Sequence, residues 1–259
     1  MLTQQQIHHF NTFGFIILRQ VFSKDELQTI NCEVMQRMES AYQHAPFDGT
    51  KRHWVPMLER ETPFFASLLE DPRFYKIAEQ LYGEDVFGIA SDANRYVGDT
   101  KWHPDTQSVH QYGIKFAFYL EPVDAETGAL RVLPGSHKNP FHDELRQARK
   151  EARLELANVP AFVCESEPGD VVGFDLRLWH ASLGGSNDRR MCTAVYYNNP
   201  KNQEEDRVTR QQAKANADTS VRFDRPPEPI HPPYWLANPH QNPKRQRWIN
   251  RMKELGFFA

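Results

Sequence analysis

The first 85 residues alternate between helical and extended hydrophobic patterns. Apolar side chains recur every three or four positions over residues 7–10 and 27–38, and a capping box precedes each run. Between these runs lies the continuous apolar stretch 15–18, which predicts a short buried strand. A further helical pattern covers residues 72–82 and ends at a glycine. This region is therefore predicted to form flanking helices and a first strand.

From residue 86 to residue 199 the apolar runs become short, and Gly, Pro, Asp and Asn clusters separate them. Many short strands at such intervals predict a β-sandwich or barrel. One interruption, 143–157, is charged and helix-prone. The predicted strands are 86–90, 94–96, 114–120, 130–133, 171–174, 178–179 and 192–197.

The remainder, 200–259, is polar and then rich in proline, which predicts an extended segment. A last helix is predicted over 243–255. Its run of Lys and Arg at 244–247 is interpreted as a solvated face. Because no internal repeat or clear linker interrupts the chain, residues 1–259 are predicted to form a single domain.

Composition narrows the class of protein. The chain has 259 residues, of which 39% are hydrophobic and 25% charged, and its net charge is −3. That balance is typical of a globular protein and disfavours a nucleic-acid binder, which would carry a basic excess. No apolar run is long enough to span a membrane, and residues 1–10 lack the layout of a signal peptide. Three widely spaced cysteines are expected to be buried reduced thiols. We therefore expect a cytoplasmic location, and the sequence indicates no oligomeric state.

A histidine and an aspartate stand two residues apart in Trp102-His103-Pro104-Asp105. On a strand, residues i and i+2 point to the same side, so these two side chains can converge on one metal ion. They would supply two ligands of a 2-His-1-carboxylate site for Fe(II), which leaves coordination positions open. By itself the pair has a second interpretation, a surface His–Asp pair at the end of a strand.

A third ligand is available at His180, which ends a turn-and-strand pattern that begins at Pro168. On its own, a histidine in that position is more often part of a packed strand end. A rival metal pair stands at 142–144, in a loop before a charged segment and without a third ligand of clear spacing. Arg189 and Arg190 head the last apolar strand pattern, where an arginine can bind a carboxylate through two parallel hydrogen bonds.

These blocks occur together in an order that resembles the phytanoyl-CoA dioxygenase family of Fe(II)/2-oxoglutarate-dependent oxygenases. The resemblance covers residues 3–199 and includes the Gly14–Leu18 strand and the His103-Pro104-Asp105 motif. It continues through the family turn at Pro134-Gly135-Ser136-His137, the 168–182 block and Arg189. The resemblance implies a mainly β fold, with a double-stranded β-helix (jelly-roll, cupin-like) core at residues 86–199 and flanking helices.

The resemblance also implies the roles of individual residues. His103, Asp105 and His180 would bind Fe(II), and Arg189 would bind the distal carboxylate of 2-oxoglutarate, with Arg190 as the alternative. Three further residues are candidates for contact with this cosubstrate: Ser182, Asn94 and Lys115. Lys115 has a second interpretation, a strand-edge lysine that points to water. His137 is expected to brace the family turn.

The implied activity is oxidation of an unactivated C–H bond of a small molecule, with conversion of 2-oxoglutarate and O2 to succinate and CO2. Halogenating relatives lack the carboxylate ligand, so Asp105 favours hydroxylation or a related desaturation or ring closure. The loops 47–56 and 107–112 and the segment 143–157 are expected to form the entrance. Their aromatic and cationic residues favour a small polar or anionic substrate. Two alternatives remain, a non-catalytic metal- or ligand-binding jelly-roll protein and a cupin-like metal-dependent hydrolase or isomerase.

Overall fold

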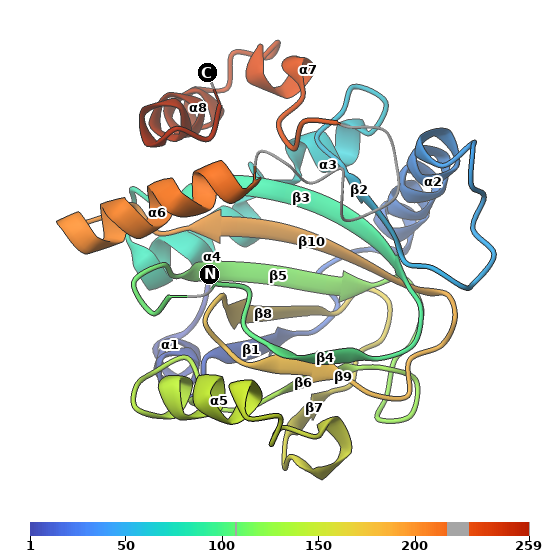
Figure 1. The fold of residues 1–259 in the computed structure, drawn as a ribbon. Helices are drawn as coiled ribbons and strands as arrows, with labels where there is room; N and C mark the ends of the chain where they lie inside the picture. The colour runs from blue at the N-terminus through green and yellow to red at the C-terminus, as the bar shows by residue number, and fades with distance from the viewer. Residues whose placement is uncertain (107, 217–227, 259) are drawn as a thin grey trace.

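Two antiparallel sheets form the centre of the computed structural model, which describes residues 1–106, 108–216 and 228–258 (Figure 1). The larger sheet has the strand order β1-β8-β5-β10-β3-β2, and the smaller sheet has the order β4-β9-β6-β7. The predicted mainly β fold class is therefore confirmed. The strands are β1 (Phe15–Leu18), β2 (His53–Pro56), β3 (Phe87–Tyr96), β4 (Thr100–His103), β5 (Gly113–Tyr119), β6 (Leu130–Val132), β7 (Phe162–Cys164), β8 (Val171–Asp175), β9 (His180–Ser182) and β10 (Arg189–Tyr197).

Helices flank the sheets on both sides. The two predicted capping boxes are present at Thr3 and Ser23, where each side chain accepts a hydrogen bond from the first helical turn. Gly14 ends the first helix with a φ of 84°, a conformation that suits a residue without Cβ. The helices are α1 (Gln4–Phe13), α2 (Lys24–Ala41), α3 (Pro63–Leu68), α4 (Pro72–Tyr82), α5 (Phe141–Lys150), the 3-10 helix η1 (Leu156–Asn158), α6 (Gln203–Asn216), α7 (Pro233–Leu236) and α8 (Pro243–Leu255).

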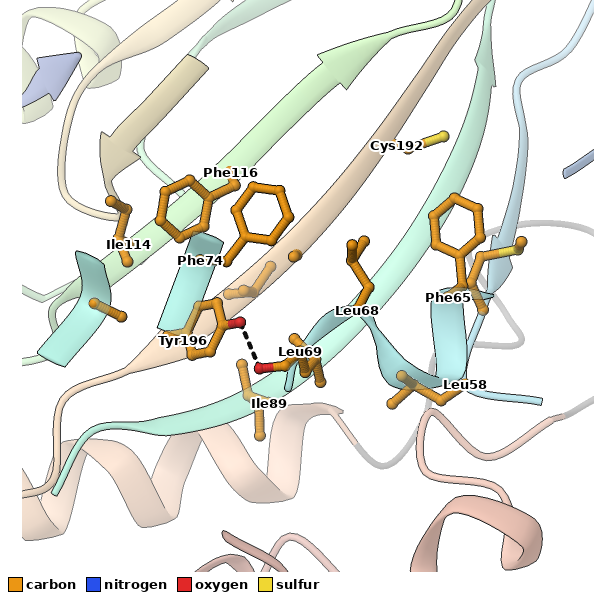
Figure 2. Packing of buried hydrophobic residues seen from close by; sticks show 14 of the residues in the cluster. Leu58, Phe65, Leu68, Leu69, Phe74, Ile89, Ile114, Phe116, Cys192 and Tyr196 are labelled. Atoms are coloured by element: carbon orange, nitrogen blue, oxygen red, sulfur yellow. Dashed lines mark hydrogen bonds between the residues drawn. The ribbon is translucent and has the colours of Figure 1, made fainter. Parts of the chain in front are cut away.

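The main hydrophobic core lies between the outer face of the larger sheet and the helices α2, α3, α4 and α8 (Figure 1). Figure 2 shows Phe74 of α4 beside Phe116 of β5, and their ring centroids are 5.0 Å apart. Near them the hydroxyl of Tyr196 donates a hydrogen bond to the carbonyl of Leu69 at 2.7 Å. Since alternate residues of each strand point to this core, the remaining residues point between the two sheets.

Several predicted element boundaries were wrong. The two candidate strands at 86–90 and 94–96 form one continuous strand, β3. Residues 178–179 belong to a turn, and β9 begins only at His180. Residues 53–56, expected within an entrance loop, form the edge strand β2, which pairs with β3. The first 85 residues thus contain two strands, β1 and β2. The helix expected over 143–157 is α5, which ends at Lys150.

The C-terminal region differs in part from its prediction. The helix over 243–255 is confirmed as α8, whereas the polar segment after residue 200 contains the unpredicted helix α6. The proline pair at 226–227 lies outside the described residues. Cys164 and Cys192 are buried as expected, but Cys32 is exposed. No helix of the described residues has the length and apolar character needed to cross a membrane.

Trp248 of α8 packs the C-terminal region against the larger sheet. Its side chain is 4% exposed, its indole N–H donates to the Val86 carbonyl at 3.1 Å, and its ring packs against Gly88. We expect Trp248→Ala to lower the free energy of unfolding by about 3–5 kcal/mol, since it leaves a large cavity. Urea denaturation measures this loss. The neighbouring exposed Arg247 supplies the control, because Arg247→Ala should change stability by less than about 0.5 kcal/mol. Equal losses in both variants would contradict the packing role of Trp248.

Candidate active site

Three predicted side chains, His103, Asp105 and His180, lie together between the two sheets. Each contributes one potential ligand atom, and these atoms lie within 4.8 Å of one another. His103 ends β4 and His180 begins β9, and the two residues are directly paired across the strands. The Nε2 atom of His180 lies 3.8 Å from Oδ1 of Asp105. It is the only such three-ligand group within residues 1–106, 108–216 and 228–258.

The backbone around Asp105 differs from the prediction, which placed this residue on the same strand as His103. Strand β4 ends at His103, so Asp105 lies in the bend that follows and does not share a strand with the histidine. The carbonyl of Leu176 accepts hydrogen bonds from the backbone N–H groups of Asp105 and Thr106, at 2.9 and 3.1 Å. Leu176 belongs to the turn between β8 and β9, which leads directly to His180.

Both histidines present the same ring nitrogen to the cavity. The Nδ1 atom of His103 lies 2.7 Å from the Lys101 carbonyl, and that of His180 lies 2.9 Å from the Leu178 carbonyl. A carbonyl oxygen only accepts, so each Nδ1 carries the proton and each Nε2 keeps its lone pair. Burial lowers the pKa of both rings, to about 3 for His180, so both are neutral near pH 7. Two neutral imidazoles and a carboxylate fit a divalent transition metal such as Fe(II).

Lys115 of β5 contacts the same carboxylate. Its Nζ atom lies 3.2 Å from Oδ1 and 3.1 Å from Oδ2 of Asp105. Burial alone would raise the pKa of Asp105, but the charge and hydrogen bonds of the Lys115 ammonium oppose this effect, and the pKa is lowered to about 2. Of the two interpretations of Lys115, the structure supports the inward-facing one, although its contact is Asp105.

A cavity of about 330 Å³ extends from this cluster to Arg189 at the start of β10. The Nη2 atom of Arg189 donates to Ser182 Oγ at 2.9 Å, and that hydroxyl lies 2.9 Å from Thr100 Oγ1. Arg189 is only 2% exposed. Room for its guanidinium depends on two glycines, since a Cβ on Gly128 or Gly185 would lie 2.1 or 1.9 Å from Nη1. The buried guanidinium is therefore positioned to bind an anion inside the cavity.

The neighbouring arginine points elsewhere. Arg190 binds Glu121, with Nε 3.1 Å from Oε2, and donates from Nη1 to Asn31 Oδ1 at 2.6 Å. It does not line the cavity. The geometry thus favours Arg189 of the two candidates.

Asn94 is buried on β3, and its side chain supports a cavity residue. Its Oδ1 accepts a hydrogen bond from Nε of Arg52 at 3.0 Å, and the Arg52 guanidinium lies 4.2 Å from the centroid of the Tyr96 ring. Arg52 and Tyr96 line the cavity, whereas Asn94 does not. The suggested contact of Asn94 with the cosubstrate stays a prediction.

The predicted entrance residues are mostly placed elsewhere. The aromatic and cationic residues expected at the entrance are Arg52, His53, Trp54, His110 and Tyr112, and of these only Arg52 lines the cavity. His53 and Trp54 are buried in β2, where the His53 ring stacks on Tyr42 at a centroid distance of 3.6 Å. His110 is exposed, and Tyr112 packs under the Arg177 guanidinium. Because β2 pairs with β3, its side chains are fixed by the sheet and cannot line an open loop.

The two other predicted histidines have surroundings that suit structural roles. His137 is 3% exposed and packs against Gly14, where an added Cβ would lie 2.5 Å from its Nδ1. His142, of the rival metal pair, is buried at the start of α5, and its Nδ1 lies near the carbonyls of Ser136 and Arg177. His142 joins no three-ligand group in the described part of the chain.

Six residues of the cavity wall were not predicted from the sequence. These residues alternate along strands with the residues of the outer core, so strand parity at β3, β5, β8 and β10 is the signal that could have found most of them. The wall residues not singled out are Tyr96, Thr100, Tyr119, Leu130, Phe174 and Met191.

Comparisons with known proteins agree on one family. The family model described as phytanoyl-CoA dioxygenase (PhyH) matches residues 10–192. An ectoine dioxygenase of Bordetella bronchiseptica is 24% identical over 217 residues, which cover 70% of each chain. The dioxygenase FrzG of a Cladobotryum species is 24% identical over 211 residues, which cover 69% of this chain and 67% of the relative.

Solved structures share the fold. A crystal structure of HygX from Streptomyces hygroscopicus with nickel and 2-oxoglutarate superposes with a TM-score of 0.65, at 20% identity, over 79% of this chain and 90% of HygX. EctD from S. alaskensis, with 2-oxoglutarate and 5-hydroxyectoine, superposes with a TM-score of 0.57, at 21% identity, over 76% of each chain.

The three-ligand cluster predicts that a divalent metal stabilises the folded protein. At a Co(II) concentration 100 times the dissociation constant, we expect the melting temperature to rise by roughly 5–10 °C. His103→Ala should abolish this rise because it removes one ligand, while His110→Ala, at an exposed position, should preserve it. Thermal melts with and without Co(II) check this for each variant. An unchanged rise in His103→Ala would place the metal elsewhere.

Proposed function

Because this chain belongs to the phytanoyl-CoA dioxygenase family, an Fe(II)- and 2-oxoglutarate-dependent dioxygenase family, we propose that it hydroxylates a C–H bond of a small molecule. In this reaction one oxygen atom of O2 enters the product, and the other enters succinate as 2-oxoglutarate loses CO2. The observation that carries the proposal is the presence of a three-ligand cluster and a buried arginine in one cavity.

His103, Asp105 and His180 would hold the metal. Bound Fe(II) would supply the centre at which O2 is activated, since three protein ligands leave positions open for other ligands. The backbone carbonyls of Lys101 and Leu178 keep both imidazoles in the ligating tautomer. Asp105 also argues for hydroxylation over halogenation, because its carboxylate fills the position that a halide would need.

Arg189 would bind the distal carboxylate of 2-oxoglutarate, with Ser182 as its hydrogen-bonded neighbour and Thr100 hydrogen-bonded to Ser182 in turn. A guanidinium removed from water binds a carboxylate more strongly than an exposed one. Leu130 and Met191 are apolar parts of the wall. They would exclude water from the reacting atoms.

The cavity favours a small substrate of polar or anionic character. Its volume of about 330 Å³ is shared with the cosubstrate, and Arg52 contributes a cation near the Tyr96 ring. The EctD structure holds 5-hydroxyectoine, and a second structure of HygX holds hygromycin B, so these two neighbours bind different compounds. The family therefore does not identify the substrate of this chain, and the wall of the cavity is the better guide.

The proposal is tested by anaerobic titration of the metal-free protein with Fe(II) and 2-oxoglutarate. Chelation of Fe(II) by the keto acid should give a weak visible absorption band, and admission of air should then yield succinate and CO2. Asp105→Ala should abolish product formation, because it removes a ligand. A protein that binds Fe(II) but shows neither the band nor 2-oxoglutarate turnover would favour the binding-protein or hydrolase alternatives.

The two arginines give a matched pair of variants for the cosubstrate site. Arg189→Ala should raise the KM for 2-oxoglutarate roughly 10- to 100-fold, since it removes charge-assisted hydrogen bonds. Arg190→Ala should change this KM less than about threefold, because Arg190 binds Glu121 and Asn31 away from the cavity. Steady-state kinetics of 2-oxoglutarate turnover measures both. The reverse pattern would assign the cosubstrate to Arg190.

A further inference from the structure

We propose that Lys115 sets the charge balance of the active site: its ammonium opposes binding of the divalent metal and favours binding of the dianionic cosubstrate. The proposal rests on the function proposed above. It assigns to one residue two effects of opposite sign, which a purely structural lysine would not have.

The first observation is that Lys115 and the metal would share one carboxylate. The ammonium lies within hydrogen-bond distance of both oxygens of Asp105, at 3.1 and 3.2 Å. One of these oxygens, Oδ1, is also the atom that faces Nε2 of His180 at 3.8 Å. A cation bound between His180 and Asp105 would therefore compete with the ammonium for Oδ1 and lie close to a like charge.

The second observation is that a second carboxylate, Asp92, lies in the electrostatic environment of Lys115. Asp92, on β3, interacts electrostatically with the ammonium and is largely removed from water. Asn94 Nδ2 also donates to Asp92 Oδ1, at 2.8 Å. Without Lys115, Asp105 would lose its ion-pair partner, and Asp92 would lose one of the positive charges near it. An empty site without Lys115 would then attract a metal cation more strongly than the native site does.

The third observation concerns the whole cavity. Arg52, Lys115 and Arg189 line it, while the carboxylates nearby are Asp105 in the wall and Asp92 beside Lys115. A divalent metal would add two positive charges beside Lys115, and 2-oxoglutarate, with two negative charges, would compensate the metal. The charge of the site therefore suits the metal and the cosubstrate bound together. Lys115 lies where its ammonium repels the metal and attracts the cosubstrate.

Lys115→Met should therefore change the affinities for Co(II) and for 2-oxoglutarate in opposite directions. Loss of the ammonium removes repulsion of the metal, so Co(II) should bind at least tenfold more tightly in the absence of 2-oxoglutarate. The same loss removes attraction for the cosubstrate, so 2-oxoglutarate should bind at least tenfold more weakly to the Co(II)-saturated protein. Distortion of the site would weaken both ligands, which distinguishes it from the charge effect.

Two further lysine variants control for position and charge. Lys115→Arg keeps the positive charge and should stay within about threefold of the wild-type protein for both ligands. Lys150→Met removes the charge of an exposed lysine at the end of α5, outside the cavity, and should also change each affinity less than threefold. Isothermal titration calorimetry under argon measures both dissociation constants without requiring turnover.

The outcomes separate this inference from the proposed function. Unchanged or weaker Co(II) binding by Lys115→Met, or unchanged 2-oxoglutarate binding, would overturn the role of Lys115. A wild-type protein that binds neither Co(II) nor 2-oxoglutarate would instead overturn the proposed function. If Lys115→Met does not fold, the Asp92→Asn/Lys115→Met double variant removes the unpaired Asp92 charge. Compared with Asp92→Asn alone, it should show the same two opposite shifts.

Discussion

The turn between β8 and β9 is the constraint on which the active site depends. The buried Asp175 carboxylate accepts two hydrogen bonds from the Arg177 guanidinium, at 2.8 and 2.6 Å, and one from the Tyr82 hydroxyl at 2.8 Å. This closed arrangement holds the Leu176 carbonyl toward the backbone of Asp105, and the same turn leads into His180. Two of the three potential metal ligands are thus positioned by one short segment. The third, His103, is joined to it through the pairing of β4 with β9.

The C-terminal region contributes to the same arrangement from the other side. Tyr112, at the end of the loop that follows Asp105, makes two hydrogen bonds with Asn198: its backbone N–H donates to Asn198 Oδ1 at 3.0 Å, and its carbonyl accepts from the Asn198 backbone N–H at 2.9 Å. The Tyr112 ring lies 4.8 Å below the Arg177 guanidinium, and its hydroxyl lies 3.5 Å from Glu205 of α6. The loop after the candidate metal motif is therefore fixed between the β8–β9 turn and the first residues of the tail. Helix α6 itself packs through the buried side chains of Val208 and Ala213.

Sequence patterns predicted the parts of the site that depend on local spacing. His103, Asp105, His180 and Arg189 stand in short motifs, and the structure places all four in one cavity wall. What spacing could not predict is contact between distant segments. Residues 53–56 carry no clear strand pattern and end in a proline, which an edge strand tolerates, so only pairing with β3 makes them a strand. In the same way, the position of Asp105 follows from the Leu176 carbonyl 71 residues away and not from alternation along a strand.

The charges in the cavity help to distinguish an oxygenase from a protein that only binds a metal. A site that had only to retain a metal would gain affinity from further carboxylates and would lose it from a lysine against one of its ligands. Here Lys115 contacts Asp105, and a second buried cation, Arg189, occupies the far end of the same cavity. Burial of a guanidinium beside Gly128 and Gly185 costs free energy unless an anion compensates it. Both features favour a metal that works together with an anionic ligand over a metal that is only stored or structural, which is the physical reason to prefer the oxygenase over a binding protein.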